Sequence, residues 1–393
     1  MKKACKMEKK RMVIVIVSVI LLLAVIGVSA YWGIPVGLII DKDSVQKIET
    51  NVQKFEAGTY GDYMALGKVD AEGNLTDEPF KIITFTDLHL DTYFNKGARS
   101  ISHMIENIKA ENPDLVILTG DIVTSSTNWL RVKQFGKLMD ELGVYWCTVL
   151  GNHEGDNWRS IKREKFVDVW SSFQYCLMHD DPDAVADGVW GNGNYVINLV
   201  KSGGAITQSL IFMDSGNRVS KQDAERLNIS KESYDYIKPS QIKWYRGVIS
   251  KLEAMQQEQP ILSMLYIHIP LQEYADAYNI VTEEQLEEGQ TASDNETLYV
   301  CGKAYEKVSA SDYNSGLFAT LVEEGHTQAV FCGHDHINNF IIQYQGIYLV
   351  YVQKGGYSSY DMATRGLGEE NQGYTNTVVN ADGSIGITHF INK

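Results

Sequence analysis

The feature that most constrains this chain of 393 residues is a series of short apolar runs, each followed directly by a polar block rich in Asp, His, Asn and Gly. Helical periodicity fills most of the intervals between the runs, and an alternation of strands and helices predicts an α/β sheet with crossover connections. The strands expected after residue 328 lack such helices and indicate a second, more antiparallel sheet. Five polar blocks follow expected strands in this way: residues 86–89, 119–121, 150–154, 268 and 332–336.

These blocks are rich in residues that bind metal ions. Five of the nine histidines fall in them. In the first block Asp87 and His89 stand two positions apart, so in an extended segment both side chains point to the same side and can hold one ion. Ligands of α/β proteins bind beyond the carboxyl ends of the strands, where all five blocks are expected. Nitrogen and oxygen donors without thiolate favour Fe, Mn, Zn or Co.

The same residue types predict hydrolysis at two metal ions. A bridging carboxylate can hold two cations ~3.5–4 Å apart, and the pair lowers the pKa of a shared water so that a hydroxide forms near neutral pH. The positive charge also stabilises a phosphoryl group in its in-line transition state. Such a reaction requires no activated serine, and the sequence contains no GxSxG motif.

In combination the blocks resemble the motifs of the calcineurin-like metallophosphoesterase family, which are DxH, GD, GNH[DE], a single His and GHxH. The resemblance runs from about residue 80 to residue 352. It implies an α/β sandwich in which two mixed β-sheets pack together and are flanked by helices. It also implies a phosphoesterase that uses two divalent or trivalent metal ions, with Fe, Mn and Zn as the candidates.

The resemblance assigns a role to each motif residue. Four residues would bind the first metal ion, with the third of them as a bridge: Asp87, His89, Asp121 and His336. Three more would complete the second site: Asn152, His268 and His334. A hydroxide that bridges the two ions would attack phosphorus. His153, which is not a ligand in the family, would protonate the leaving alkoxide or stabilise the phosphate oxygens.

The second block separates this chain from two branches of the family. Protein Ser/Thr phosphatases contain GDxxDRG, whereas residues 120–126 read GDIVTSS, so the carboxylate that pairs with the catalytic histidine and the arginine are both missing. Plant and mammalian purple acid phosphatases contain GDxxY, and Thr124 replaces the tyrosine that binds iron. Three other segments are similar to bacterial, yeast and plant phosphatases loosely related to purple acid phosphatases: residues 191–196, 213–216 and 234–245.

The N-terminal segment predicts a membrane anchor. Residues 1–11 contain six basic side chains and one acidic side chain, and residues 12–40 contain no charge. About 20 apolar residues span a bilayer, and basic residues before such a span stay cytoplasmic. We therefore expect a cytoplasmic tail over 1–11, a single-pass signal anchor over 12–32, a stalk over 33–78 and an extracytoplasmic catalytic domain over 79–393. The small residues before and at Ala30 leave open a secreted form cleaved near that position.

The charge composition indicates which classes of molecule the protein binds. The chain has 35 Lys+Arg and 50 Asp+Glu and a formal net charge of −15, which argues against a nucleic-acid partner and favours a small phosphorylated substrate. Two other functions stay open: a phosphodiesterase of nucleotides or cyclic nucleotides with the same centre, and a surface module that holds metal and binds a ligand without turnover. The five cysteines show no CxxC spacing, and a 147/332 or a 176/301 disulfide stays open.

Overall fold

The computed structural model describes residues 17–18, 45–90, 96–124, 128–156, 160–256, 260–282, 285, 291–292, 297–360, 362–368 and 372–391. Apart from residues 17–18, the signal anchor predicted over residues 12–32 lies outside the described residues, as does the tail over 1–11. Within the described ranges, no helix combines the length and the apolar character needed to cross a membrane.

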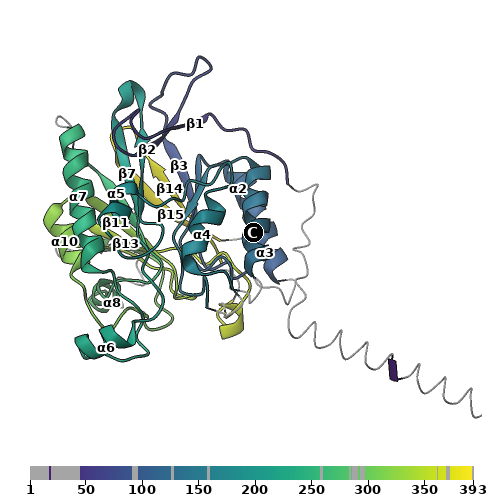
Figure 1. Ribbon diagram of the computed structural model, residues 1–393, viewed down its shortest axis with the longest axis vertical. Coiled ribbons are helices and arrows are strands. Elements are labelled where there is room, and N and C mark those ends of the chain that lie inside the picture. The colour runs from purple at the N-terminus through teal and green to yellow at the C-terminus, as the bar shows by residue number, and fades with distance from the viewer. Residues whose placement is uncertain are drawn as a thin grey trace, which may run out of the picture.

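The described strands form two mixed sheets (Figure 1). The large sheet has ten strands in this spatial order: β1 (Val52–Phe55), β2 (Met64–Lys68), β6 (Tyr195–Val200), β7 (Ile206–Phe212), β8 (Ser263–Tyr266), β11 (Thr327–Cys332), β13 (Ile347–Tyr351), β12 (Ile341–Tyr344), β10 (Thr297–Cys301) and β9 (Thr291–Ala292). The small sheet has five: β15 (Ile385–Ile391), β14 (Gly373–Val379), β3 (Phe80–Phe85), β4 (Leu115–Leu118) and β5 (Trp146–Thr148). Strands β3, β4 and β5 run parallel, as do β7, β8, β11 and β13, so the polar blocks gather at one edge of each sheet.

Helices cover the outer faces of both sheets (Figure 1). Three helices share a core with the small sheet: α2 (Lys96–Glu111), α3 (Asn128–Leu142) and α4 (Arg163–Trp170). Three others pack on the large sheet: α7 (Pro239–Met255), α8 (Glu273–Asn279) and α10 (Leu317–Glu324). Short helices lie in the connections: α5 (Pro182–Ala186), η2 (Ser202–Gly204), α6 (Lys221–Leu227) and η3 (Ala363–Arg365). Ile101, Met104, Ile105 and Ile108 of α2 are buried at three- and four-residue spacing, which is the apolar stripe of an amphipathic helix.

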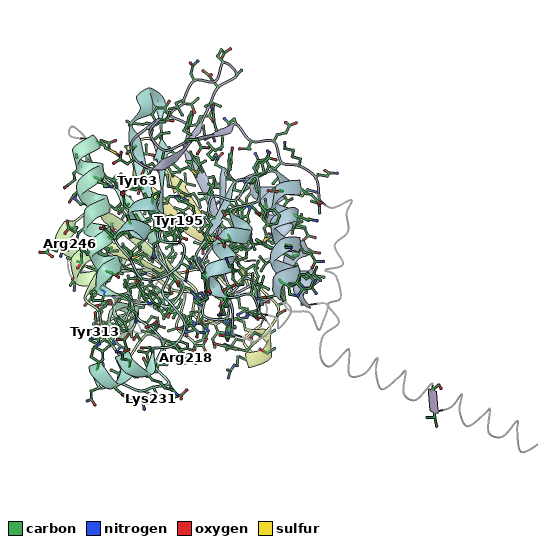
Figure 2. All side chains as sticks on the ribbon, in the orientation of Figure 1. Tyr63, Tyr195, Arg218, Lys231, Arg246 and Tyr313 are labelled. Carbon is green, nitrogen blue, oxygen red and sulfur yellow. The ribbon has the colours of Figure 1, made fainter. Side chains whose placement is uncertain are left out.

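Four aromatic rings on neighbouring strands of the large sheet belong to the core shared with the small sheet. Tyr195, Phe212, Tyr266 and Phe331 stack in succession, with centroid distances of 4.4, 5.0 and 4.7 Å. The Tyr195 hydroxyl (Figure 2) donates to the carbonyl of Thr148 at 2.7 Å and accepts from the N–H of the same residue at 3.1 Å. Because Tyr195 lies in β6 and Thr148 in β5, these bonds fix one sheet against the other.

The two packed sheets and their flanking helices confirm the predicted layers, but the division of the strands differs. The prediction of a separate sheet built from the strands after residue 328 is wrong, because β11 pairs in parallel with both β8 and β13 and thereby joins the large sheet. Strands β14 and β15 join the small sheet instead. The segment 33–78, predicted as a stalk, contains β1 and β2, and β2 pairs in parallel with β6. The four cysteines of the described part are free: Cys147, Cys176, Cys301 and Cys332.

Candidate metal centre

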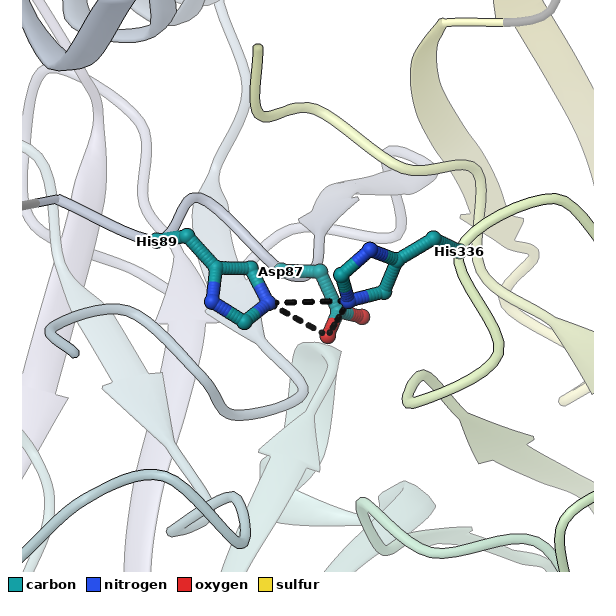
Figure 3. Close-up of side chains that lie close together, drawn as sticks. All are labelled: Asp87, His89 and His336. Carbon is teal, nitrogen blue, oxygen red and sulfur yellow. Dashed lines mark hydrogen bonds and ion pairs between the residues drawn. The ribbon is translucent and has the colours of Figure 1, made fainter. Parts of the chain in front are cut away.

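Asp87, His89 and His336 converge beyond the carboxyl ends of the strands (Figure 3). Asp87 and His89 follow β3 of the small sheet, and His336 follows β11 of the large sheet. The Nε2 atoms of His89 and His336 lie 2.9 Å apart, and each lies 3.4 Å from Asp87 Oδ1. All three side chains are buried. Donor atoms that lie so close together could hold one metal ion.

Asp121 and His268 form an adjoining group. Asp121 Oδ2 lies 3.3 Å from His268 Nε2 and 3.7 Å from His89 Nε2. Asn152 Oδ1 lies 2.9 Å from His268 Nε2. Donor atoms of Asp87, Asp121 and His268 lie within 4.8 Å of one another and could hold a second ion. Because Asp121 Oδ2 is near both groups, the arrangement agrees with a bridging carboxylate.

Two buried atoms of this cluster that could bind a metal ion have no hydrogen-bond partner among the described residues: Asp87 Oδ1 and His334 Nε2. The His334 ring lies 5.2 Å from that of His268, measured between centroids. An unpaired buried polar atom costs about 1–3 kcal/mol, and native structures contain few of them unless a ligand completes them. The donor set of carboxylate, imidazole and amide groups therefore fits a metal centre of Fe, Mn or Zn.

The backbone at the site is strained. The φ angle is 53° at Asp87, 47° at His89, 50° at Asp121 and 77° at His334, a region that residues other than glycine rarely adopt. Such strain concentrates at functional sites, where the surrounding structure enforces it. A Cβ at Gly151 would collide with the carboxylate of Asp121, so glycine is required for this close approach.

The carboxylate of Glu154 holds together the turns after β4 and β5. It accepts hydrogen bonds from the backbone N–H groups of Asp121 (3.0 Å), Ile122 (2.6 Å), Val123 (3.1 Å) and Gly151 (2.7 Å). Its side chain is buried, and burial together with the nearby charge of Asp121 raises the pKa of Glu154 to about 7. One side chain thus fixes the backbone of the turn that carries the Asp121 carboxylate.

Backbone carbonyls orient two of the histidines. His268 Nδ1 lies 2.7 Å from the carbonyl oxygen of Thr119, and His336 Nδ1 lies 2.8 Å from that of Tyr360. When His268 Nδ1–H donates to its carbonyl, the Nε2 lone pair of the neutral ring is free to bind a metal ion. Lys354 Nζ donates to the same Tyr360 carbonyl at 2.8 Å and also lies 2.9 Å from His336 Nδ1.

Burial and neighbouring charges together decide which groups of the cluster are charged. It lowers the pKa of His89 to about 4 and that of His334 to about 3, so both imidazoles are neutral at pH 7. Burial by itself would raise the pKa of Asp121, but the charge of His268 reverses the effect and lowers that pKa overall. Burial lowers the pKa of His268, whereas Asp121 raises it to about 9. A metal ion at His268 Nε2 would require this imidazole to be deprotonated at that atom.

His153 stands at the open side of the cluster. Its side chain is 46% exposed, and its ring centroid lies 5.6 Å from that of His89. Its Nδ1 atom contacts Asp156 Oδ2, and its backbone N–H donates to Asp121 Oδ1 at 2.8 Å. Burial lowers the pKa of His153, but the hydrogen bond to Asp156 outweighs it and raises the pKa to about 9. His153 therefore carries a proton at neutral pH.

The residues predicted from the sequence all lie in this one cluster: Asp87, His89, Asp121, Asn152, His153, His268, His334 and His336. Their roles as ligands and catalytic groups stay predictions. Sequence reasoning missed Asp156 and Lys354. The position of Asp156 two residues after the GNHE block is the one available signal for it.

Comparison with known proteins shows which family the chain belongs to. A sequence profile described as calcineurin-like phosphoesterase matches residues 80–338. The chain belongs to the calcineurin-like phosphoesterase family. This confirms the resemblance that the polar blocks indicated.

Relatives of this phosphoesterase include plant and yeast proteins. It is 27% identical over 318 residues to "Probable inactive purple acid phosphatase 14" of Arabidopsis thaliana, and the match covers 72% of each chain. It is 27% identical over 292 residues to "Phosphatase DCR2" of Saccharomyces cerevisiae, which covers 68% of this chain and 46% of that protein. A solved dimetal phosphatase from Danio rerio is similar at a TM-score of 0.46 and 12% identity, over 76% of this chain and 93% of the other. The plant relatives agree with the predicted similarity to proteins related to purple acid phosphatases.

Proposed function

We propose that this calcineurin-like phosphoesterase hydrolyses phosphate esters at a dinuclear metal centre. The observation that carries the proposal is the pair of buried donor atoms, Asp87 Oδ1 and His334 Nε2, that lack a hydrogen-bond partner among the described residues. They lie where Asp and His side chains from both sheets converge. One bound cation at each site would satisfy these atoms, whereas a purely structural role would leave them without a hydrogen bond.

The chain offers a complete set of ligands for two ions. One ion would be held by four residues: Asp87, His89, Asp121 and His336. The other would be held by four residues that share the bridging carboxylate: Asp121, Asn152, His268 and His334. Ions bound in this way neutralise phosphate charge and lower the pKa of bound water, so that water becomes a nucleophile near neutral pH.

His153 acts on the leaving group in this proposal. Its side chain is partly exposed, next to the buried ligands, and is protonated at neutral pH. It would donate a proton to the leaving alkoxide oxygen or a hydrogen bond to a phosphate oxygen, a contribution of roughly 10²- to 10⁴-fold for a general acid. The hydrogen bond from its backbone N–H to Asp121 keeps its position fixed relative to the bridging carboxylate. The net charge of −15 favours a small phosphorylated substrate over a polyanion.

A second candidate is a module that holds metal and binds a ligand without turnover. The names of three Arabidopsis relatives, which describe them as probable inactive purple acid phosphatases, favour it. The complete set of candidate ligands and the exposed, protonated His153 favour the enzyme.

An activity assay on the purified full chain separates the two candidates. The chain is stripped with a chelator, reloaded with Mn²⁺, Zn²⁺ or Fe, and assayed with p-nitrophenyl phosphate and bis(p-nitrophenyl) phosphate. We expect metal-dependent hydrolysis that His153→Ala lowers and that the matched variant His326→Ala leaves unchanged. The ratio of the two substrates distinguishes a phosphomonoesterase from a phosphodiesterase. Tight metal binding with no hydrolysis of either substrate would overturn the proposal and support the binding module.

A further inference from the structure

The segment that follows β7, residues 214–218, is held rigidly beside the metal centre. The buried carboxylate of Asp214 accepts hydrogen bonds from the guanidinium of Arg163, from the N–H of Asn192 at 3.0 Å and from the N–H of Gly216 at 2.9 Å. Residues 213–216, which overlap this segment, are similar in sequence to phosphatases related to purple acid phosphatases, yet no side chain of residues 214–218 belongs to the metal cluster. We call residues 214–218 the β7 loop.

The β7 loop is also joined to the strand that supplies a candidate ligand. Ser215 Oγ accepts hydrogen bonds from the backbone N–H of His268 at 3.3 Å and of Ile269 at 3.0 Å. Two buried hydrogen bonds therefore set the position of the β7 loop relative to His268.

Asn217 extends from this loop to the side chain that contacts His153. Its Nδ2 atom donates to Asp156 Oδ1 at 2.7 Å, and the other carboxylate oxygen, Asp156 Oδ2, contacts His153 Nδ1. The backbone carbonyl of Asn217 accepts from the N–H of Asp235 at 3.1 Å, which fixes the residue from its other side. A continuous chain of hydrogen bonds thus runs from the β7 loop through Asp156 to the imidazole.

Arg218, the next residue of the loop, contacts a tyrosine that packs against His334. The guanidinium of Arg218 stacks over the ring of Tyr234, with its carbon 3.9 Å from the ring centroid, and Tyr234 packs edge-on against His334 at 4.3 Å. Arg218 and Tyr234 also form an isolated antiparallel bridge. The β7 loop therefore contacts Asp156, whose carboxylate contacts His153, and Tyr234, whose ring packs against His334.

We propose that Asp156, held by Asn217, is the positioning residue for His153, an inference that rests on the proposed function. Asp156 accepts the hydrogen bond from Nδ1–H and so leaves Nε2–H as the donor toward the leaving group. As the P–O bond breaks, its electron pair goes to the leaving oxygen, which takes the Nε2 proton, and His153 is left neutral until water returns a proton. Asp156 remains a carboxylate throughout and fixes the tautomer and the ring orientation.

The dependence of the rate on the leaving group tests this role. An alkyl phosphate such as glycerol phosphate has a basic leaving oxygen that needs a proton, whereas the nitrophenolate of p-nitrophenyl phosphate leaves readily without one. We expect Asp156→Asn to lower kcat for the alkyl ester by roughly 10- to 100-fold, the usual cost of losing an orienting partner, and to lower kcat for the aryl ester much less. Asn217→Ala should show the same selectivity at smaller size, and Asp156→Glu should restore part of the alkyl activity.

The matched control is Asp168→Asn, which removes an exposed carboxylate that pairs with Lys165 three residues away in α4. It should leave both rates unchanged, and metal content should be equal in all variants. Equal loss on both substrates in Asp156→Asn, or no loss on either, would overturn the positioning role while the proposed function stands. A wild-type chain that hydrolyses neither ester would overturn both.

Discussion

Asp121 Oδ2 lies 3.3 Å from His268 Nε2, and the two residues come from different sheets. Asp121 follows β4 of the small sheet, and His268 follows β8 of the large one. The proposed metal centre could therefore form only when the two sheets are packed against each other, so we expect metal binding and folding to be coupled.

Metal binding should stabilise the fold. Asp87 Oδ1 and His334 Nε2 are buried without a hydrogen-bond partner in the described structure, so a metal-free chain bears an uncompensated cost. At a free ion concentration of 100 Kd we expect the free energy of unfolding to rise by about 2.7 kcal/mol. Denaturant unfolding with chelator and with Mn²⁺ or Zn²⁺ measures this. The Asp87→Asn variant should respond less, and an equal response in wild type and variant would contradict the assignment of Asp87 as a ligand.

Glu154→Gln should damage both the fold and the metal centre. The amide offers one acceptor oxygen in place of two, and its NH₂ group faces backbone N–H donors. We expect a loss of about 1–3 kcal/mol in the free energy of unfolding and a loss of roughly 10- to 100-fold in metal affinity. Denaturant unfolding and metal titration check the two values. Glu164→Gln, at an exposed position in α4, is the control, and similar results for both variants would contradict the supporting role of Glu154.

Tyr195→Phe should loosen the contact between the sheets. The change removes one hydroxyl and leaves both the N–H and the carbonyl of Thr148 without this partner, while the aromatic stack is kept. We expect a destabilisation of about 1–3 kcal/mol. Hydrogen exchange at Thr148 should become faster in the variant. Unchanged exchange together with unchanged stability would show that these two hydrogen bonds do not hold the sheets.

His389 should make stability fall in mild acid. Burial lowers its pKa from 6.5 to about 4, so as the pH falls the unfolded chain takes up a proton before the folded chain does. The stabilisation is complete above pH 6.5 and is lost as the pH falls from there toward 4. Denaturant unfolding of wild type and His389→Gln at pH 7.5 and pH 5 tests this, with a larger loss expected for the wild type. Equal losses would mean that His389 does not contribute.

The sequence predicts the metal cluster well because its residues directly follow apolar runs. Asp87 and Asp121 each follow a buried strand, and parallel strands place such residues at one edge. Position in the chain was sufficient to find them. Asp156 was missed because its contact with His153 depends on the conformation of the turn after β5 and on Asn217, which is remote in sequence.

Three strands, β14, β1 and β2, are hard to predict from the sequence. Strand β14 lies between β15 and β3, yet its buried residues include Thr375, Asn376 and Thr377, so it has no apolar run. Strands β1 and β2 are short and are separated by a turn-rich segment, so the pairing of β1 with β2 and of β2 with β6 depends on packing rather than on local pattern. Local periodicity cannot reveal a strand whose stability comes from its neighbours.

The most direct test of a dinuclear phosphoesterase is to measure metal content and ester hydrolysis together in wild type and Asp121→Asn. We predict that the wild-type chain binds two ions and hydrolyses p-nitrophenyl phosphate. Asp121→Asn should bind fewer ions and lose at least about 100-fold in rate, since even the loss of an orienting partner costs roughly 10- to 100-fold. Hydrolysis at the wild-type rate by Asp121→Asn, or by a chain stripped of metal, would contradict the account.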